Sequence, residues 1–320
     1  MPNNLFKELE TTLNNARDIA IIIHQKADGD ALGSALALAE YFKKNNLNYT
    51  LFQAGKKSDY LSFVNDYKDF INDEKIFQNK KFSHLVFLDC GELRQSGLEK
   101  ILPQLKYSYT SINIDHHVSN PSFAKLNFIF PQASSTSEIL YDFFEKIRFP
   151  INKTIAGHLL LGIYSDTQTL TNLATTPKTI KVVSGLLSRG AQIKPISKNL
   201  EMKRVATLKL WAKALQRITR VDKYKITYTI ITQKDLEECK LDQEATGGIA
   251  NFFNTVEEDG VNMILTEMAD GSIKGSLRTT SAEQDVAKLA ACFNGGGHKK
   301  AAGFRINGQL KQTNSGWKII

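Results

Sequence analysis

Residues 19–34 read IAIIIHQKADGDALGS, and this stretch decides the fold class of the N-terminal half. The apolar, β-branched run predicts a buried strand over Ile19–His24, and the helical pattern of Gly33–Lys44 follows it. Working outward, we expect further strands at Tyr49–Phe52, His84–Asp89 and Ser111–Asp115, and helices at Ser135–Lys146, Asn152–Tyr164 and Pro177–Leu187. This alternation is typical of an α/β fold with a doubly wound, mainly parallel sheet covered on both faces.

The pattern changes after residue 190. A basic helix is expected over 191–222, with apolar side chains at helical spacing. Beyond it we expect strands at Tyr224–Ile231, Asn262–Glu267, Ser272–Arg278 and Ala302–Ile306, and helices near Gln243–Thr255 and Asp285–Cys292. The sequence therefore predicts a first domain over 1–190, a basic helical linker over 191–222 and a smaller α+β domain over 223–320, with a cleft between the two domains.

The charge of the chain is concentrated in one segment. The 320 residues include 41 Lys and Arg against 33 Asp and Glu, a formal net charge of +8. Residues 191–225 hold ten basic and two acidic side chains, so this segment carries the entire surplus. A basic balance indicates an anionic partner such as a nucleic acid or a nucleotide. The segment is either the solvated face of a connector or a border that attracts anionic substrate.

Several classes of protein are excluded or disfavoured. Cys90, Cys239 and Cys292 form no CxxC pair, so neither a disulfide framework nor a zinc knuckle is expected, and a reducing cytoplasm is indicated. The first apolar run is too short for a signal peptide or a membrane span, so no membrane partner is expected. The chain contains no GxxxxGK[ST], GxGxxG, HExxH or GxSxG motif.

Asp and His side chains follow three predicted strands and one predicted helix. The set comprises His24, Asp28 and Asp30 after the first strand, Asp89 after the second, Asp115, His116 and His117 after the third, and Asp166 at the end of the helix. Ligands of an open parallel sheet bind beyond the carboxyl ends of its strands, so we expect these side chains to lie close together. Neighbouring carboxylates repel each other, and divalent cations would offset this repulsion.

The ligand types indicate the class of metal. Carboxylate and imidazole groups without thiolates suit Mn²⁺, Fe²⁺, Mg²⁺ or Co²⁺ better than a structural zinc ion. The set is large enough to hold two ions that share one Asp ligand. Two-metal phosphoesterases use such a pair to acidify a water molecule that attacks phosphorus.

A second motif lies near the C-terminus. Arg278 ends a predicted strand, and a glycine-rich turn at Asn294–Gly297, with His298 directly after it, follows a predicted helix. Glycines let the backbone approach an anion closely, and Arg278 and His298 can donate to its oxygens. The alternative is an ordinary helix end followed by a solvated Lys299–Lys300 pair.

Together, HQKADGDALGS, the strand end at Asp89, IDHH, GIYSDT and GGGHKKAAGF resemble the DHH phosphoesterase family in its two-domain form, above all its bacterial oligoribonuclease and pAp phosphatase branch. The resemblance spans about residues 15–310 and implies a DHH catalytic domain over 1–190 and a substrate-binding domain over 223–320. It implies that His24, Asp28 and Asp89 hold one Mn²⁺, and that Asp30, Asp89, His116 and Asp166 hold a second. It also implies that Asp115 orients His116, that His117 faces the scissile phosphate, and that Arg278, Gly296, Gly297 and His298 bind substrate.

The resemblance implies a cytoplasmic, Mn²⁺-dependent exonuclease of short single-stranded RNA that also converts 3′-phosphoadenosine 5′-phosphate (pAp) to AMP and phosphate, with Mg²⁺ or Co²⁺ as substitutes. It leaves a homodimer open. Alternatives are a cyclic-di-AMP or pApA phosphodiesterase, a pyrophosphate or polyphosphate hydrolase, a non-catalytic nucleotide- or RNA-binding protein that kept the fold, and a binder of long single strands. Gln168 and Leu170 stand where the family often has Gly and Phe, and this difference bears on substrate preference.

Overall fold

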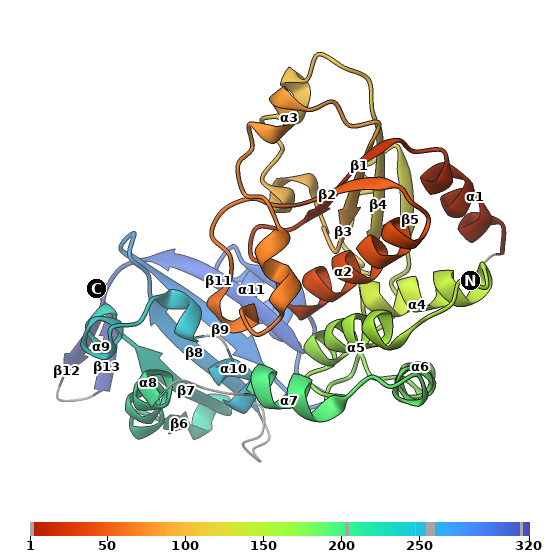
Figure 1. Ribbon diagram of the computed structural model, residues 1–320. Helices are drawn as coiled ribbons and strands as arrows, with labels where there is room; N and C mark the ends of the chain where they lie inside the picture. Colours follow the sequence, from red (N-terminus) through yellow and green to blue (C-terminus); the bar gives the residue numbers. More distant parts are fainter. Residues whose placement is uncertain (1–2, 202–204, 247, 254–259, 314–315) are drawn as a thin grey trace. The chain divides into compact units, whose positions relative to one another are not determined.

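The computed structural model describes residues 3–201, 205–246, 248–253, 260–313 and 316–320. The chain divides into two compact units, Met1–Met202 and Lys203–Ile320 (Figure 1). Within the described ranges, no helix combines the length and the apolar character that crossing a membrane requires.

The first unit is built on a five-stranded parallel sheet in the order β2-β1-β3-β4-β5. Its strands are β1 (Asp18–Ile23), β2 (Asn48–Gln53), β3 (His84–Leu88), β4 (Thr110–Asp115) and β5 (Leu126–Ile129). The predicted parallel sheet is confirmed, and β5 is a strand that the sequence pattern did not reveal. Because β1 lies between β2 and β3, the strand order reverses beside it, which is the switch point of a doubly wound fold.

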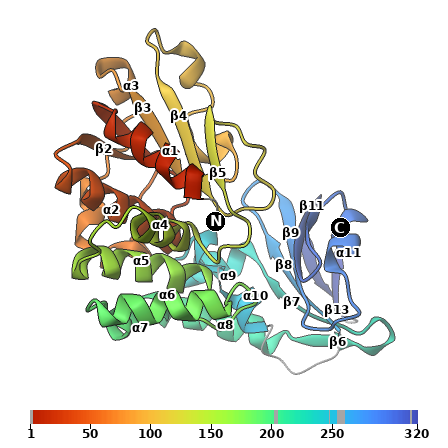
Figure 2. The same ribbon diagram turned by 90° about the vertical axis from the view of Figure 1, so that its right-hand side faces the viewer.

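Helices and loops cover both faces of this sheet. The helices are α1 (Asn3–Asn14), α2 (Gly29–Lys44), α3 (Ile76–Asn79), α4 (Thr136–Lys146), α5 (Lys153–Asp166), α6 (Pro177–Ser188) and α7 (Ile193–Glu201). Helices α2, α4 and α5 lie side by side on one face, where they pack on Ile19, Ile21 and Ile23 (Figures 1 and 2). Ala20 and Ile22 point to the other face, toward α3 and the loops around it. Burial on both faces explains why β1 is apolar at every inner position.

The prediction of a basic helix over 191–222 is wrong for the C-terminal part of this segment. The structure describes α7 and α8 (Val205–Gln216) in this segment, and residues 202–204 lie outside the described residues. Helix α8 ends at Gln216, and Thr219–Val221 forms strand β6, which pairs with the second sheet. Ile196 of α7 belongs to the core of the first unit and Leu210 of α8 to that of the second. The segment therefore contributes core residues to both units.

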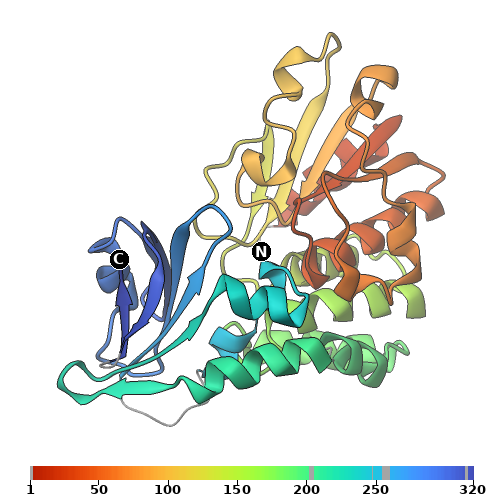
Figure 3. The ribbon, with the colours of Figure 1, turned by 90° about the vertical axis from the view of Figure 1, so that its left-hand side faces the viewer.

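The second unit contains a mixed six-stranded sheet in the order β10-β11-β9-β8-β7-β6. Its strands are β6, β7 (Ile226–Ile231), β8 (Val261–Glu267), β9 (Ser272–Arg278), β10 (Gly296–His298) and β11 (Ala301–Asn307), and β12 (Leu310–Thr313) pairs separately with β13 (Gly316–Ile319). Helices α8, α9 (Gln233–Cys239) and α10 (Ile249–Phe253) cover one face, and α11 (Val286–Ala291) covers the other (Figures 2 and 3). The predicted α+β class is confirmed.

Two local predictions for this unit need correction. The helix expected over 243–255 is a short 3₁₀ turn at Gln243–Thr246 followed by α10, and residues 254–255 lie outside the described residues. The glycine-rich turn expected at Asn294–Gly297 ends early, because Gly296–His298 forms β10. The backbone of these glycines therefore pairs with β11.

A buried ion pair stabilises the second unit and makes its stability depend on pH. Asp235 is 3% exposed and accepts hydrogen bonds from the Arg217 guanidinium and the Thr232 amide. Burial alone would raise the pKa of Asp235, but these donors hold it well below its usual range. Breaking a buried pair leaves an uncompensated charge, so we expect Asp235→Asn to lower the free energy of unfolding at pH 7 by about 3 kcal/mol.

The sign of the pH effect follows from the lowered pKa. The stabilisation by Asp235 is complete above the unfolded pKa of about 3.9 and is lost as the pH falls below it. Urea denaturation should therefore show the same difference between the wild type and Asp235→Asn at pH 7 and pH 5 and a smaller difference at pH 3, because the loss is complete only below the lowered folded-state pKa. Asp222→Asn is the control, because that carboxylate is 86% exposed and its pair with Arg220 is solvated. An unchanged difference at pH 3 would contradict the prediction.

Candidate metal centre

The predicted Asp and His residues of the first unit meet at the carboxyl edge of the parallel sheet. His24 and Asp28 follow β1, Asp89 follows β3, and β1 and β3 are neighbours at the switch point. His116 follows β4, which pairs with β3. The fold therefore brings these side chains together because loops after adjacent parallel strands leave the sheet at the same edge.

The first group of candidate ligands consists of His24, Asp28 and Asp89, each with one ligand atom within 4.8 Å of the others. Nε2 of His24 lies 3.6 Å from Oδ2 of Asp89 and 3.9 Å from Oδ1 of Asp28. The Asp28 carboxylate also caps α2 by accepting the amide hydrogens of Asp30 and Ala31. This cap fixes its position at the start of the helix.

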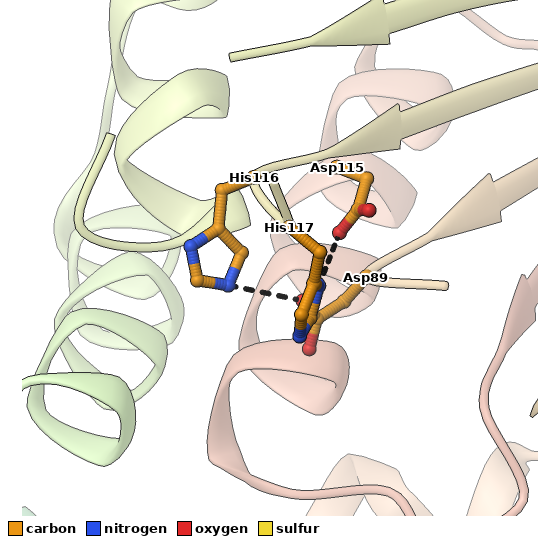
Figure 4. Close-up of side chains that lie close together, drawn as sticks. All are labelled: Asp89, Asp115, His116 and His117. Carbon is orange, nitrogen blue, oxygen red and sulfur yellow. Dashed lines mark hydrogen bonds and ion pairs between the residues drawn. The ribbon is translucent and has the colours of Figure 1, made fainter. Parts of the chain in front are cut away.

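The second group consists of Asp30, His116 and Asp166. Nε2 of His116 lies 2.9 Å from Oδ2 of Asp166, which stands at the end of α5. The same nitrogen lies 3.6 Å from Oδ1 of Asp89, and Figure 4 shows the two side chains facing each other. Asp89 thus presents Oδ2 to His24 and Oδ1 to His116. This carboxylate lies between the two groups, as a ligand shared by two metal ions would.

The electrostatics of the centre suit a divalent cation. Burial and the Asp89 charge raise the pKa of Asp30 to about 8, and burial with the Asp30 charge raises the pKa of Asp166 well above its usual range. Burial opposes ionisation of His116, but the Asp166 carboxylate outweighs it and raises the pKa of His116 to about 10. A cation would hold these carboxylates ionised and the imidazole neutral.

One buried atom supports the same fit. Among the described residues, Nε2 of His116 has no properly directed hydrogen bond, although Asp166 lies within 2.9 Å. A buried polar atom without such a bond is costly in a protein interior. An imidazole nitrogen and carboxylate oxygens that converge in this way satisfy each other through a metal ion between them. The residues present therefore fit a divalent cation.

The expected role of Asp115 is corrected by the geometry. Asp115 was expected to orient His116, but its Oδ1 lies 2.7 Å from Nδ1 of His117 (Figure 4). The side-chain amide of Asn120 donates to its Oδ2 at 2.6 Å. Asp115 and His117 thus form a dyad held by Asn120. With Nδ1 of His117 bound to Asp115, the other ring nitrogen is left for a ligand.

Thr136 is a residue of this centre that the sequence analysis missed. Its amide donates to Asp30 and its hydroxyl donates to Asp89. The sequence does hold a signal beside it, because Ser135 followed three residues later by Glu138 is typical of a capping box at a helix start. Only half of that capping box forms: Ser135 accepts the Glu138 amide, but the Glu138 carboxylate bonds elsewhere.

The C-terminal candidates lie together in the second unit. Ala301 pairs with His298 on one side and with Arg278 on the other, so all three share one face of the sheet. Two strand spacings separate His298 from Arg278, about 10 Å, across a small alanine. Burial lowers the pKa of Arg278, and no described carboxylate forms an ion pair with it. A half-buried guanidinium of this kind suits an anionic ligand.

The neighbouring glycines have different roles. Gly297 has a φ of 142°, and a Cβ there would approach the Ala301 carbonyl to 2.6 Å, so only glycine fits. A Cβ at Gly296 would meet nothing within 4 Å, so that position is open. Gly296 therefore leaves free space beside His298, and Gly297 allows β10 to pair with β11.

Comparison with protein families identifies both units. Residues 18–163 match the model of the DHH family, N-terminal domain, and residues 223–314 match that of the DHHA1 domain. The chain is a DHH-family phosphoesterase. The DHH match contains five of the six candidate metal ligands, and the DHHA1 match contains Arg278 and His298.

Relatives of this DHH protein extend over most of its length. The probable bifunctional oligoribonuclease and PAP phosphatase NrnA of Streptococcus mutans is 27% identical over 299 residues, covering 93% of this chain and 92% of the relative. A probable manganese-dependent inorganic pyrophosphatase of Lactobacillus delbrueckii is 28% identical over 158 residues, covering 48% of this chain and 49% of the relative. An exopolyphosphatase-related protein of Bacteroides fragilis has the same fold, with a TM-score of 0.87 at 22% identity over 96% of this chain and 92% of its own.

The loop after Asp166 is strained. Gln168, Thr169 and Leu170 have φ values of 49°, 57° and 69°, three consecutive residues in the left-handed region. That conformation costs a residue with a Cβ roughly 1–2 kcal/mol, and glycine avoids the cost. Because glycine also loses more entropy on folding, we expect Gln168→Gly to gain about 0.5–1 kcal/mol, or about 2–4 °C in melting temperature.

Thermal denaturation without metal measures this gain. Gln132→Gly is the matched control, since Gln132 is an exposed turn residue whose φ is not positive. Replacing it with glycine should therefore lower the stability. A Gln168→Gly protein that melts at or below the wild-type temperature would refute the strain at this position.

Proposed function

We propose that this DHH protein is a Mn²⁺-dependent two-metal phosphoesterase that hydrolyses short oligoribonucleotides and converts pAp to AMP and phosphate. The observation that carries the proposal is the Asp89 carboxylate, with one oxygen facing each group of candidate ligands. The substrates are suggested by the NrnA relative, which aligns with 93% of the chain. Manganese is suggested by the pyrophosphatase relative and by the carboxylate and imidazole ligand set.

In the proposed site, His24, Asp28 and Asp89 hold one cation, and Asp30, Asp89, His116 and Asp166 hold the other. When bound, two such ions polarise the phosphoryl oxygens and lower the pKa of water, which makes water a nucleophile near neutral pH. Hydrolysis of pAp consumes one water molecule, breaks the bond between phosphorus and the 3′ oxygen, and releases inorganic phosphate.

The remaining proposed residues act on the substrate. Asp115 accepts a hydrogen bond from Nδ1 of His117 and raises the pKa of that imidazole, and the protonated ring can donate from its other nitrogen to a phosphate oxygen. Arg278 offers two parallel N–H groups to a phosphate, and His298, the open position at Gly296 and the backbone of Gly297 complete the substrate-binding set. We also propose a cytoplasmic location, since all three cysteines are free thiols.

A turnover panel with Mn²⁺ tests the proposal. The substrates are pAp, a dinucleotide RNA, a cyclic dinucleotide, pApA and inorganic pyrophosphate, each assayed with Mn²⁺, Mg²⁺ or Co²⁺ and after EDTA treatment. We expect the highest kcat/KM with pAp and the RNA dinucleotide, and loss of turnover in EDTA. A clear preference for the cyclic dinucleotide or pApA would favour the phosphodiesterase alternative. Absence of turnover on every substrate would favour a binding protein that kept the fold.

A further inference from the structure

The first turn of α4 contacts two carboxylates that belong to different groups of candidate ligands. The Thr136 amide donates to Oδ2 of Asp30 at 2.6 Å, and the Ser137 amide donates to Oδ1 of the same carboxylate at 2.9 Å. The Thr136 hydroxyl donates to Oδ1 of Asp89 at 3.2 Å. Thr136 and Asp30 are fully buried and Asp89 is 2% exposed, so no bulk water competes for these bonds.

Contacts of the Glu138 side chain fix the position of this first turn of α4. Glu138 is fully buried, and its Oε2 accepts hydrogen bonds from Ser134 at 2.7 Å and from Thr179 at 2.9 Å. Its Oε1 lies 2.9 Å from the Lys178 ammonium. Thr179 and Lys178 belong to α6, so this carboxylate ties the start of α4 to a second helix. The donors of Thr136 therefore come from a rigid element.

Helix α5 confines the Asp30 carboxylate from the other side. A Cβ at Gly162 would overlap both the Asp30 carboxylate and the Ser137 hydroxyl. Glycine at this position lets α5 approach the first turn of α4 closely, and Asp30 lies in the remaining space. The Asp30 side chain is thus enclosed between two helices, and its orientation depends on the amides of α4.

The hydroxyl of Thr136 decides the orientation of Asp89. It binds Oδ1, the oxygen that faces His116 at 3.6 Å, and this bond leaves Oδ2 facing His24 at 3.6 Å. Without the bond, only the longer ion pairs with His24, His116 and His117, at 3.6–3.8 Å, would orient the Asp89 carboxylate. Hydrogen bonds of this kind set the direction and the charge of a metal ligand.

We propose that Thr136 is a positioning residue for both cations of the centre, through its amide on Asp30 and its hydroxyl on Asp89. This inference rests on the metal-ligand role of Asp30 and Asp89 in the proposed function. It assigns to α4, an element that carries none of the candidate ligands, the task of spacing the two sites. The contribution of the Thr136 side chain depends on one hydroxyl group, and a substitution can remove this group without changing the backbone amide.

Thr136→Val tests the inference, because valine keeps the shape and the backbone amide but lacks the hydroxyl. We expect Mn²⁺ to bind about 10–100-fold more weakly, as measured by calorimetric titration and by the EPR signal of free Mn²⁺. Thr136→Ser keeps a hydroxyl and is expected to restore the affinity to within about threefold of the wild type. Activity with saturating Mn²⁺ is measured separately, so a loss of affinity is distinguished from a loss of turnover.

Thr175→Val is the matched control. The Thr175 hydroxyl is also buried, and within the described part of the chain it has no hydrogen-bond partner, so its removal should leave Mn²⁺ affinity unchanged. Circular dichroism and melting in EDTA establish that each variant is folded. If Thr136→Val does not fold, Thr136→Ala carries the same test, because it also removes only side-chain atoms.

The outcomes separate the two proposals. Wild-type protein that binds Mn²⁺, together with a folded Thr136→Val protein that binds it equally well, would overturn the positioning role alone. A Thr136→Ser protein as weak as Thr136→Val would also overturn it, since the hydroxyl would then not be the cause. Wild-type protein that binds no Mn²⁺ would overturn the proposed function and this inference with it.

Discussion

Asp89→Asn is expected to reduce Mn²⁺-dependent hydrolysis of pAp by a factor of about 10³ or more in kcat/KM. Asp89 lies between His24 and His116 and presents one oxygen to each. An amide has the same shape but lacks the negative charge, and it offers one oxygen where two cations need two. A factor of 10³ corresponds to about 4 kcal/mol of transition-state stabilisation, which is the scale of a metal ion's contribution.

A second readout shows that the loss comes from the metal sites and not from misfolding. Asp89 contributes to the repulsion that raises the pKa values of Asp28 and Asp30. Burial opposes the ionised form of Asp89, but His24, His116 and His117 outweigh burial and hold its pKa below its usual range, so removing the charge should lower the stability of the metal-free protein. Melting in EDTA establishes that the variant is still folded. Mn²⁺ should raise the melting temperature of the wild type but not that of Asp89→Asn, since a ligand stabilises only the state that binds it.

Asp73→Asn is the control for the change in net charge, because Asp73 is exposed and, among the described residues, its carboxylate accepts a hydrogen bond only from the nearby Lys75 amide. It should retain wild-type turnover and the wild-type response to Mn²⁺. Full turnover by Asp89→Asn would refute the two-metal mechanism.

Arg278→Ala is expected to lower kcat/KM for pAp by about 10²-fold, mostly through KM, with Mn²⁺ affinity unchanged. Arg278 ends β9, is half-buried, and forms no ion pair with a described carboxylate, so its charge is available for a phosphate group. A charge-assisted, bidentate pair of this kind contributes about 3 kcal/mol, which corresponds to the expected factor. Arg278→Lys should restore little of it, because an ammonium cannot form the two parallel bonds.

Arg305→Ala is the matched control for Arg278→Ala. Arg305 lies on β11 and on the same face of the sheet, but its guanidinium already pairs with Asp270 at 2.9 Å. It should therefore have wild-type KM. Steady-state kinetics with pAp, combined with calorimetric titration of Mn²⁺, separates the two effects. An Arg278→Ala protein with unchanged KM, or with weakened Mn²⁺ binding, would contradict the assignment.

Most of the metal centre was predictable because it depends on strand ends. The apolar runs before His24, Asp89 and Asp115 predict strands, and parallel strands deliver the residues that follow them to one edge. The structure brings all six candidate ligands into the two groups of this centre. Local patterns also predicted the start of α4 at Ser135 and the proline-led start of α6.

Other predictions failed where side-chain direction or strand pairing overrides the pattern of the local sequence. Asp115 was assigned to His116, its neighbour in the chain, but the side chains of adjacent residues leave β4 in different directions, and His117 is the one that turns back to it. The basic segment was expected to stay helical to residue 222, because helical periodicity continues past Gln216. Pairing of β6 with β7 overrides that periodicity. The glycine run was expected as a turn because glycine favours turns, and pairing with β11 makes Gly296–His298 a strand.

The resemblance to the family came from the motifs. The periodicity of the chain was sufficient for the layer architecture and for the positions of the candidate ligands. These features depend on which residues are apolar and on where strands end, and both are local properties of the sequence. Folding was needed to bring Thr136 to Asp89, a pair 47 positions apart, and Asn120 to the Asp115–His117 dyad. Hydrogen bonds between loops depend on the approach of α4 and α5 to the sheet edge, and that approach depends on close packing at Gly162. No local pattern encodes such packing, because it is a property of several segments at once.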